Sequence, residues 1–249
     1  MRQKLNWSAQ LFAVALCALA LKSYYSTATP DELRWILAPT TFFVELVSGV
    51  GFEFESLAGY MSSDHRFVIA VPCAGVNFLI TAFLMLSLRR LWRARFCGAS
   101  WSMIPFAAGL AYVATLIANT ARIWLALELR ARSVEVSGLT NNQLHRLEGV
   151  VVYFGFLLLL FLVVERFESR KPLRRERLHP LRVLAFPVVI YYAVTLGIPL
   201  ANGSYRQGSA FWEHSLFVLV LPVLLIVPPL LFAFCVSRYP NARNLAERE

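Results

Sequence analysis

The 249-residue sequence has few charged residues. Asp, Glu, Lys and Arg together make up 16% of the chain, against roughly a quarter in soluble globular proteins. Apolar residues make up 58%, which excludes a water-soluble domain. It also excludes a disordered chain, because disorder requires low hydrophobicity. Internal repeats and low-complexity tracts are absent too, so the chain is not a repeat array.

Three catalytic signatures are absent as well. Without a Gly-x-Ser-x-Gly motif, serine-hydrolase chemistry is disfavoured. Nothing resembles a nucleotide-binding loop, so we expect no cofactor. Several side chains could in principle ligate zinc, but no pair has the His-Glu-x-x-His spacing, and we expect no metal. These side chains are Cys73, His65, His145, His214 and Glu148.

Apolar runs are abundant, and several are long enough to cross a bilayer core of roughly 30 Å. The first begins after a short basic segment but lacks a small-x-small cleavage site followed by a soluble domain, so we interpret it as a retained anchor. The predicted fold class is all-α, a polytopic membrane helical bundle. Its six predicted spans are 6–24, 68–88, 101–127, 149–164, 183–200 and 215–236.

A seventh apolar stretch, 33–54, is ambiguous because Pro39, Glu45 and two glycines interrupt it. If all basic stretches face the cytoplasm, the chain needs six crossings. A seventh crossing would place Arg89 on the opposite side from Arg2. We therefore predict that 33–54 is re-entrant or lies in the outer interface. The basic stretches are 2–4, 89–95, 166–182 and 238–248.

This topology distributes the charges asymmetrically. The cytoplasmic side carries 16 Lys and Arg against 5 Asp and Glu, and the outer side carries 8 against 10. Positive-inside orientation thus explains the net charge of +9, and we expect no nucleic-acid partner. We predict a multi-pass protein of the cell (inner) membrane with both termini cytoplasmic. Its parts are a membrane core at 1–168, a basic linker at 169–182, and a hairpin with a short tail at 183–249.

One of the four cysteines lies near the outer face. Cys73 follows Pro72, and because proline is favoured in a first helical turn, the thiol is predicted near a helix N-terminus. The positive end of the helix dipole stabilises a thiolate, the nucleophilic form of cysteine. Ala74 and Gly75 are small and leave room for a substrate backbone. The other three, Cys17, Cys97 and Cys235, are predicted within spans or on the cytoplasmic side.

Arg122 and His145 are predicted at the same membrane face as Cys73. An arginine on an apolar helix is costly and usually functional or paired, and Asn119 shares its helix face. The alternatives are an arginine that snorkels to headgroups and a merely interfacial histidine. Together, the three side chains would supply a thiolate, a cation for an oxyanion, and an imidazole for a leaving amine. Acyl transfer from a peptide needs these groups.

Three motifs on successive spans resemble the exosortase/archaeosortase family: Cys73-Ala74-Gly75, Asn119-x-x-Arg122 and His145-x-x-x-Gly149. The stretches 37–46 and 65–73 are most similar to the exosortase K subtype. The resemblance covers about 31–165. It implies a polytopic enzyme with a Cys-Arg-His active site at the extracytoplasmic face.

The resemblance also implies an activity. Such a protein is a membrane-embedded cysteine transpeptidase or thiol protease that cleaves the C-terminal sorting signal of secreted proteins. That signal comprises a short motif, a transmembrane helix and a basic tail. Cys73 would form a thioester, Arg122 would hold the oxyanion or the thiolate, and His145 would protonate the departing amine. The implied partners are these secreted proteins and membrane lipid.

Supporting residues are less determined by the sequence. Asn77 shares a helix face with Cys73 and is a candidate to orient a substrate carbonyl or Arg122. Asn119 is a candidate to support the site or bind substrate. Asp64 and Glu148 are both candidates to orient His145, and the sequence does not choose between them.

A small membrane transporter or assembly scaffold, with no covalent chemistry, is the alternative function. Against it, the ionisable residues are predicted at one face of the membrane. Transporter sites usually lie near the bilayer midplane. A Cys73→Ala substitution distinguishes the two, because a transporter or scaffold should keep working without the thiol.

Overall fold

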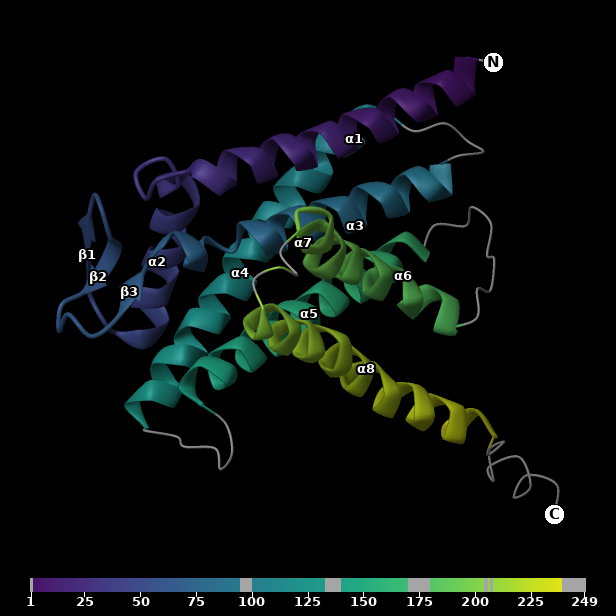
Figure 1. Cartoon of the computed structure of the whole chain (residues 1–249). Coiled ribbons are helices and arrows are strands. Elements are labelled where there is room, and N and C mark those ends of the chain that lie inside the picture. Colours follow the sequence, from purple (N-terminus) through teal and green to yellow (C-terminus); the bar gives the residue numbers. More distant parts are fainter. Residues whose placement is uncertain are drawn as a thin grey trace.

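Long helices run side by side through most of the computed structural model, with a small sheet at one end (Figure 1). The structure describes residues 2–94, 100–132, 140–169, 180–203, 206 and 208–238. The helices are α1 (Arg2–Thr27), α2 (Arg34–Ser48), α3 (Val76–Ala94), α4 (Met103–Ala131), α5 (Asn141–Ser169), α6 (Pro180–Tyr192), α7 (Ile198–Ala201) and α8 (Ser209–Arg238). Two shorter turns are the 3₁₀ helix η1 (Val71–Ala74) and the π-helix η2 (Ala193–Gly197).

Within the described part of the chain, five helices are long and apolar enough to cross a membrane. They confirm the predicted class, an all-α helical bundle of a multi-pass membrane protein. The predicted sixth span, 215–236, lies in α8, whose described apolar stretch is Phe211–Val227. The five helices comprise Asn6–Thr27, Val71–Ala94, Met103–Ala131, Gln143–Glu168 and Leu184–Ala201.

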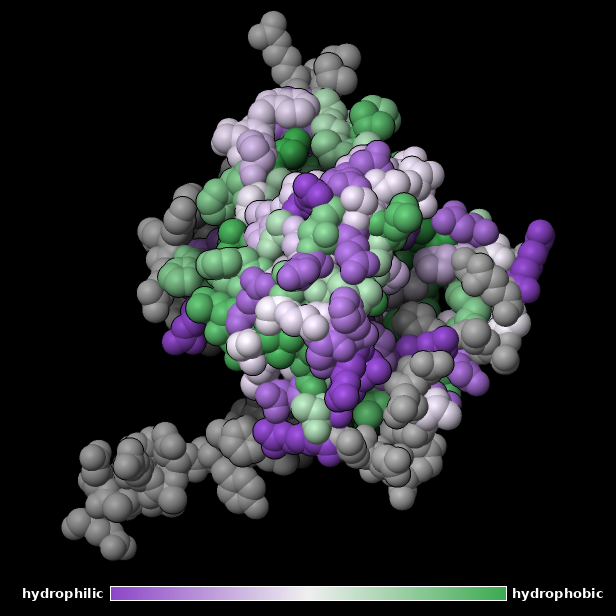
Figure 2. All heavy atoms as spheres, turned by 90° about the vertical axis from the view of Figure 1, so that its left-hand side faces the viewer, coloured by the Kyte–Doolittle hydropathy of each residue, from purple (hydrophilic) through white to green (hydrophobic). Residues whose placement is uncertain are grey.

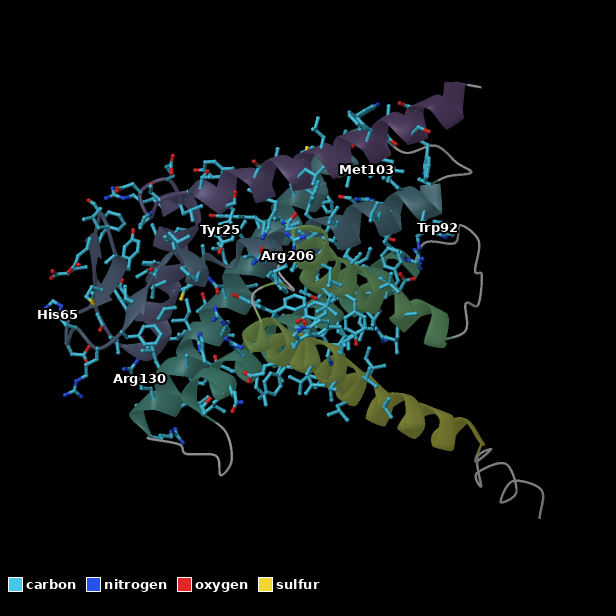
Figure 3. All side chains as sticks on the ribbon, viewed as in Figure 1. Tyr25, His65, Trp92, Met103, Arg130 and Arg206 are labelled. Atoms are coloured by element: carbon cyan, nitrogen blue, oxygen red, sulfur yellow. The ribbon has the colours of Figure 1, made fainter. Side chains whose placement is uncertain are left out.

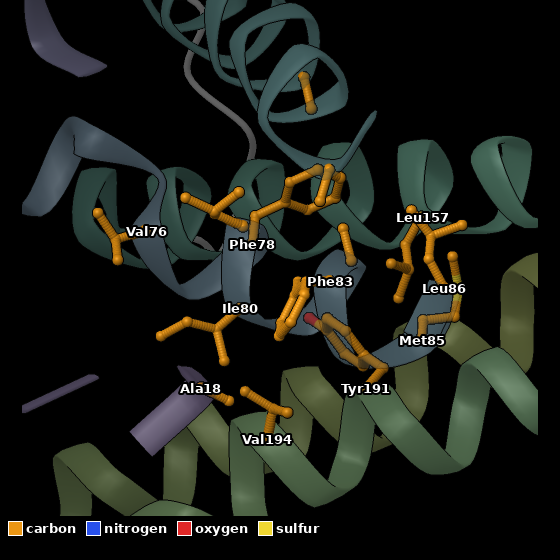
Figure 4. Close-up of a cluster of buried hydrophobic side chains, with 14 of the residues drawn as sticks. Ala18, Val76, Phe78, Ile80, Phe83, Met85, Leu86, Leu157, Tyr191 and Val194 are labelled. Atoms are coloured by element: carbon orange, nitrogen blue, oxygen red, sulfur yellow. The ribbon is translucent and has the colours of Figure 1, made fainter. Parts of the chain in front are cut away.

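Helix α3 lies at the centre of the bundle and contacts α1, α4, α5 and α6. Its sequence is apolar around most of its circumference, the pattern of a helix buried on every side. Figure 4 shows Phe78 and Phe83 of α3 among side chains from the surrounding helices, including Ala18, Leu157 and Tyr191. In a membrane, van der Waals packing of this kind is a main source of helix association, because lipid tails are as apolar as the side chains.

Helix α2 accounts for most of the ambiguous stretch 33–54. Its 15 residues extend only about 22 Å at 1.5 Å per residue, less than the bilayer core. Pro39 lacks an N–H and cannot bond the Trp35 carbonyl one turn earlier. The Tyr112 hydroxyl of α4 donates to that carbonyl instead, at 2.7 Å. This bond and a Trp35–Tyr112 ring stack hold α2 against α4.

Three short strands were not predicted from the sequence. β1 (Phe52–Glu55), β2 (Gly59–Ser62) and β3 (Val68–Ile69) form an antiparallel sheet in the order β1-β2-β3. The alternation Phe-Glu-Phe-Glu in β1 is a strand pattern that the apolar stretch 33–54 conceals. The predicted second span also begins too early, because 68–69 belong to β3 and α3 starts at Val76. Figure 2 looks onto this end of the molecule, where hydrophilic side chains gather among hydrophobic ones.

A charged cluster joins α3 to α5 at the end of the bundle away from the sheet. Arg89 donates to both carboxylate oxygens of Glu165, at 3.0 and 3.2 Å. Arg93 also binds Glu165, and it reaches Glu168 at 3.0 Å. Trp92 marks this end in Figure 3, opposite His65. Much of the predicted linker, 170–179, and Cys97 lie outside the described residues.

We expect Glu165→Gln to destabilise the protein by roughly 3 kcal/mol, because Arg89 is buried and would be left without its carboxylate. Thermal unfolding in detergent micelles measures this. The matched control is Glu128→Gln, whose ion pair with Arg132 is largely exposed and should be worth less than about 0.5 kcal/mol. Equal losses in the two variants would contradict a structural role for the cluster.

Candidate active site at one end of the bundle

Cys73 lies in η1, the single turn between β3 and α3. Pro72 is the second residue of this turn, and Gly75 ends it in the left-handed conformation, with φ of 73°. The thiol therefore lies near the N-terminus of α3, as the sequence predicted, in a separate turn that precedes the helix. The first bond of α3 is donated by Leu79 to the Gly75 carbonyl, at 3.0 Å. Cys73 is half-buried and has a free thiol.

Gly75 also allows α4 to approach η1 closely. A Cβ at this position would lie 3.1 Å from the Asn119 side chain and 3.2 Å from Cγ2 of Thr115. Only glycine combines this small volume with a positive φ at no steric cost. The Cys-Ala-Gly sequence thus brings the nucleophile's backbone against Asn119.

Asn119 is fully buried and connects Cys73 to α5. Its Nδ2 donates to the Cys73 carbonyl at 2.6 Å, and its Oδ1 accepts from the Tyr153 hydroxyl at 2.8 Å. The sequence predicted Asn119 as a supporting residue. The structure gives it a definite contact, which is to the backbone of the candidate nucleophile.

Arg122 lies one helical turn after Asn119 and is buried at this end of the bundle. Its Nη1 donates to the Tyr153 hydroxyl at 3.3 Å, and its Nη2 lies 2.9 Å from Nε2 of His145. It also interacts electrostatically with Cys73 and Glu148. The structure thus places Arg122 and His145 in direct contact, and Tyr153 and Asn119 connect Arg122 to the Cys73 backbone.

The Arg122–His145 contact defines the protonation of the imidazole. A guanidinium can only donate hydrogen bonds, so Nε2 of His145 must be the acceptor and carry no proton. The neutral ring then has its proton on Nδ1. This nitrogen faces the Glu148 carboxylate, with Nδ1 and Oε2 3.7 Å apart.

Of the two candidates to orient His145, the structure places Glu148 beside the ring. Glu148 is buried, and its Oε1 has no hydrogen-bond partner among the described residues. Asp64 instead accepts from Ser62 Oγ at 2.6 Å and from the Arg66 backbone at 3.1 Å. These bonds lower the pKa of Asp64 and hold the exposed turn around His65, at the far edge of the molecule in Figure 3.

Asn77 contacts the N-terminal helix. Its Oδ1 accepts from Nζ of Lys22 at 2.8 Å, so its observed partner is α1. From the same helix, the Tyr25 hydroxyl donates to the Val71 carbonyl at 3.4 Å. The N-terminal helix therefore braces η1 and the start of α3.

Tyr153, which joins Asn119 to Arg122, is not among the residues predicted from the sequence. A signal was present, because His145, Gly149 and Tyr153 are spaced by four and lie on one face of α5. Gly149 lies beside the arginine, since a Cβ there would be 3.4 Å from Arg122 Nε. A tyrosine in an otherwise apolar segment was interpreted as part of the span.

No group of three or more His, Cys, Asp or Glu in the described chain is arranged to hold a metal ion. The side chain of His214, one of the zinc-ligand candidates, lies outside the described set. Comparison of the chain with family models, with curated proteins and with solved structures found no match.

We expect Gly75→Ala to destabilise the protein by about 1–3 kcal/mol, because alanine is strained at positive φ and its Cβ meets Asn119. The matched control is Gly109→Ala in α4, where nothing lies within 4 Å of a Cβ and a gain of about 0.5–1 kcal/mol is expected. Thermal unfolding of both variants in micelles tests this. A neutral Gly75→Ala would contradict the close packing of η1 on α4.

Proposed function

We propose that the protein is a membrane-embedded cysteine transpeptidase or endopeptidase that cleaves a C-terminal sorting signal of secreted proteins at the extracytoplasmic face. One observation carries the proposal. Continuous contacts join the Cys73 backbone, Asn119, Tyr153, Arg122, His145 and Glu148 at one end of the bundle. The order of the exosortase-like motifs along the chain supports the same conclusion.

The distribution of charge supports the proposed side of the membrane. Cys73 lies in the turn just before α3, and Arg89, Arg90 and Arg93 lie near the other end of that helix. Thirteen positions separate Val76, the first residue of α3, from Arg89, which is about 20 Å at helical rise. Because cytoplasmic segments are rich in Lys and Arg, the Cys73 end is the one that faces outward in this proposal.

In the proposed reaction, the Cys73 thiol transfers its proton to Nε2 of His145, and the sulfur attacks the scissile carbonyl carbon. As the C–S bond forms, the carbonyl π electrons move to oxygen, and Arg122 stabilises that oxyanion. The C–N bond then breaks, and the imidazolium donates its proton to the departing amine. Water or an acceptor amine attacks the thioester, the C–S bond breaks, and a proton returns to Cys73 through His145.

The resting contacts require one rearrangement in this scheme. Arg122 occupies the lone pair of Nε2, so it must release His145 before the imidazole can accept the thiol proton. An oxyanion that draws the guanidinium toward itself would free the base at that moment. The Glu148 carboxylate, facing Nδ1, then stabilises the imidazolium, as an acidic residue does beside a catalytic histidine.

Co-expression with candidate secreted proteins that carry a C-terminal helix and basic tail tests the proposal. We expect Cys73→Ala and Cys73→Ser to abolish cleavage, Arg122→Ala to slow it by about 10²–10³-fold, and His145→Ala by about 10²–10⁴-fold. Cys17→Ala, an exposed cysteine in α1, is the matched control and should cleave normally. Cleavage by Cys73→Ala at the wild-type rate would overturn the mechanism and favour the transporter or scaffold alternative.

A second substitution pair identifies the residue that orients His145. We expect Glu148→Gln to reduce cleavage by at least about tenfold, because the imidazolium loses its counter-charge. Asp64→Asn should leave the rate unchanged, since the hydrogen bonds observed for Asp64 are to Ser62 and Arg66 of its own turn. Initial rates of substrate processing measure both. The reverse pattern would assign the orienting role to Asp64.

A further inference from the structure

We propose that Tyr153 is a positioning residue that fixes the position of the Arg122 guanidinium relative to η1, the turn that holds Cys73. The inference rests on the proposed function, since it names a residue that organises the same site. Its hydroxyl is the point at which contacts from α4 and α5 converge. One oxygen atom both donates to Asn119 and accepts from Arg122.

The tyrosine hydroxyl sets the orientation of the Asn119 amide. A phenol has a single proton, and here it is donated to Oδ1 of Asn119 at 2.8 Å. With Oδ1 facing Tyr153, the Nδ2 group of Asn119 faces the Cys73 carbonyl, 2.6 Å away. Removing the hydroxyl removes the bond that selects this orientation over the flipped amide.

The same oxygen is one of two side-chain anchors on the guanidinium. Arg122 contacts Tyr153 through Nη1 and His145 through Nη2. Its Nε is buried, and no partner for it is present among the described residues. During the proposed reaction Arg122 releases His145, so the tyrosine becomes the remaining anchor while the guanidinium moves to the oxyanion.

Ring packing and hydroxyl chemistry can be separated at this position. The Tyr153 ring stacks on Phe78 of α3, with centroids 5.3 Å apart and an interplanar angle of 27°. The Arg122 guanidinium carbon lies 5.4 Å from the ring centroid. Phenylalanine would keep both ring contacts and lose only the two hydrogen bonds. Tyr153→Phe is therefore the informative variant.

The first measurement is the kinetics of substrate processing by Tyr153→Phe. We expect kcat to fall by about 10- to 100-fold, because a displaced guanidinium stabilises the oxyanion poorly, while KM stays within about twofold. The matched control is Tyr192→Phe, which loses a hydroxyl bond to the Leu219 carbonyl in the C-terminal hairpin. A purely structural role would lower the melting temperature of both variants alike and leave kcat per folded molecule unchanged.

The second measurement needs no substrate. In a variant whose only cysteine is Cys73, the rate of alkylation by iodoacetate is divided by the rate with iodoacetamide. A cation beside the thiolate favours the anionic reagent, so Arg122→Ala defines the low value of this ratio. We expect Tyr153→Phe to lower the ratio on the order of threefold and Tyr192→Phe to leave it at the wild-type value.

The two measurements separate this inference from the proposed function. A lower ratio together with a lower kcat supports the positioning role. An unchanged ratio, or a lower ratio with unchanged kcat, overturns it. If Cys73→Ala cleaves as well as wild type, the proposed function fails, and the alkylation ratio alone decides whether Tyr153 holds Arg122 beside Cys73.

Discussion

The hydrogen bond from Asn119 Nδ2 to the Cys73 carbonyl is the contact on which the arrangement of the site depends. A chain in a membrane must pair its backbone polar groups internally, and a single 3₁₀ turn between a strand and a helix leaves carbonyls that its own backbone does not pair. Asn119 of α4 satisfies one of them, the Cys73 carbonyl, and the Tyr25 hydroxyl of α1 adds a bond to the Val71 carbonyl. The backbone turn that holds the thiol ahead of α3 is thus stabilised by side chains from two helices, α4 and α1.

The same principle explains α2 and the distant end of α3. Pro39 leaves the Trp35 carbonyl unpaired within its helix, and Tyr112 pairs it, so a side chain again replaces a missing backbone bond. At the far end, Arg89 is buried against Glu165, and the ion pair replaces the water that an exposed arginine would have. Helix α3 is therefore fixed at both ends by polar contacts and along its length by apolar packing.

The sequence predicts a feature well where apolar residues form long runs, or where a charged side chain on an apolar helix is energetically costly. Apolar runs predicted the spans, and a buried arginine on an apolar helix marked Arg122. Prediction from the sequence failed where local and tertiary effects compete. Gly75 ends the turn early and shifts the start of α3, a change that depends on the close approach of Asn119. The strands are short, and the alternation in β1 merges with an apolar run. The partners of Asn77 and Tyr153 are set by which helices are neighbours, and linear spacing does not specify this.

Arg122 also explains why so many polar groups are collected in one place. A guanidinium withdrawn from water needs its donors occupied, and here the acceptors are a phenol and a neutral imidazole rather than a carboxylate in direct contact. A tight ion pair with Glu148 would neutralise Arg122 and hold it still. Neutral acceptors leave the positive charge of Arg122 available to Cys73. They also let Arg122 release the His145 imidazole at a low energetic cost. In the proposed reaction this weaker hold is an advantage, because preorganised but uncommitted charge contributes most to the transition state.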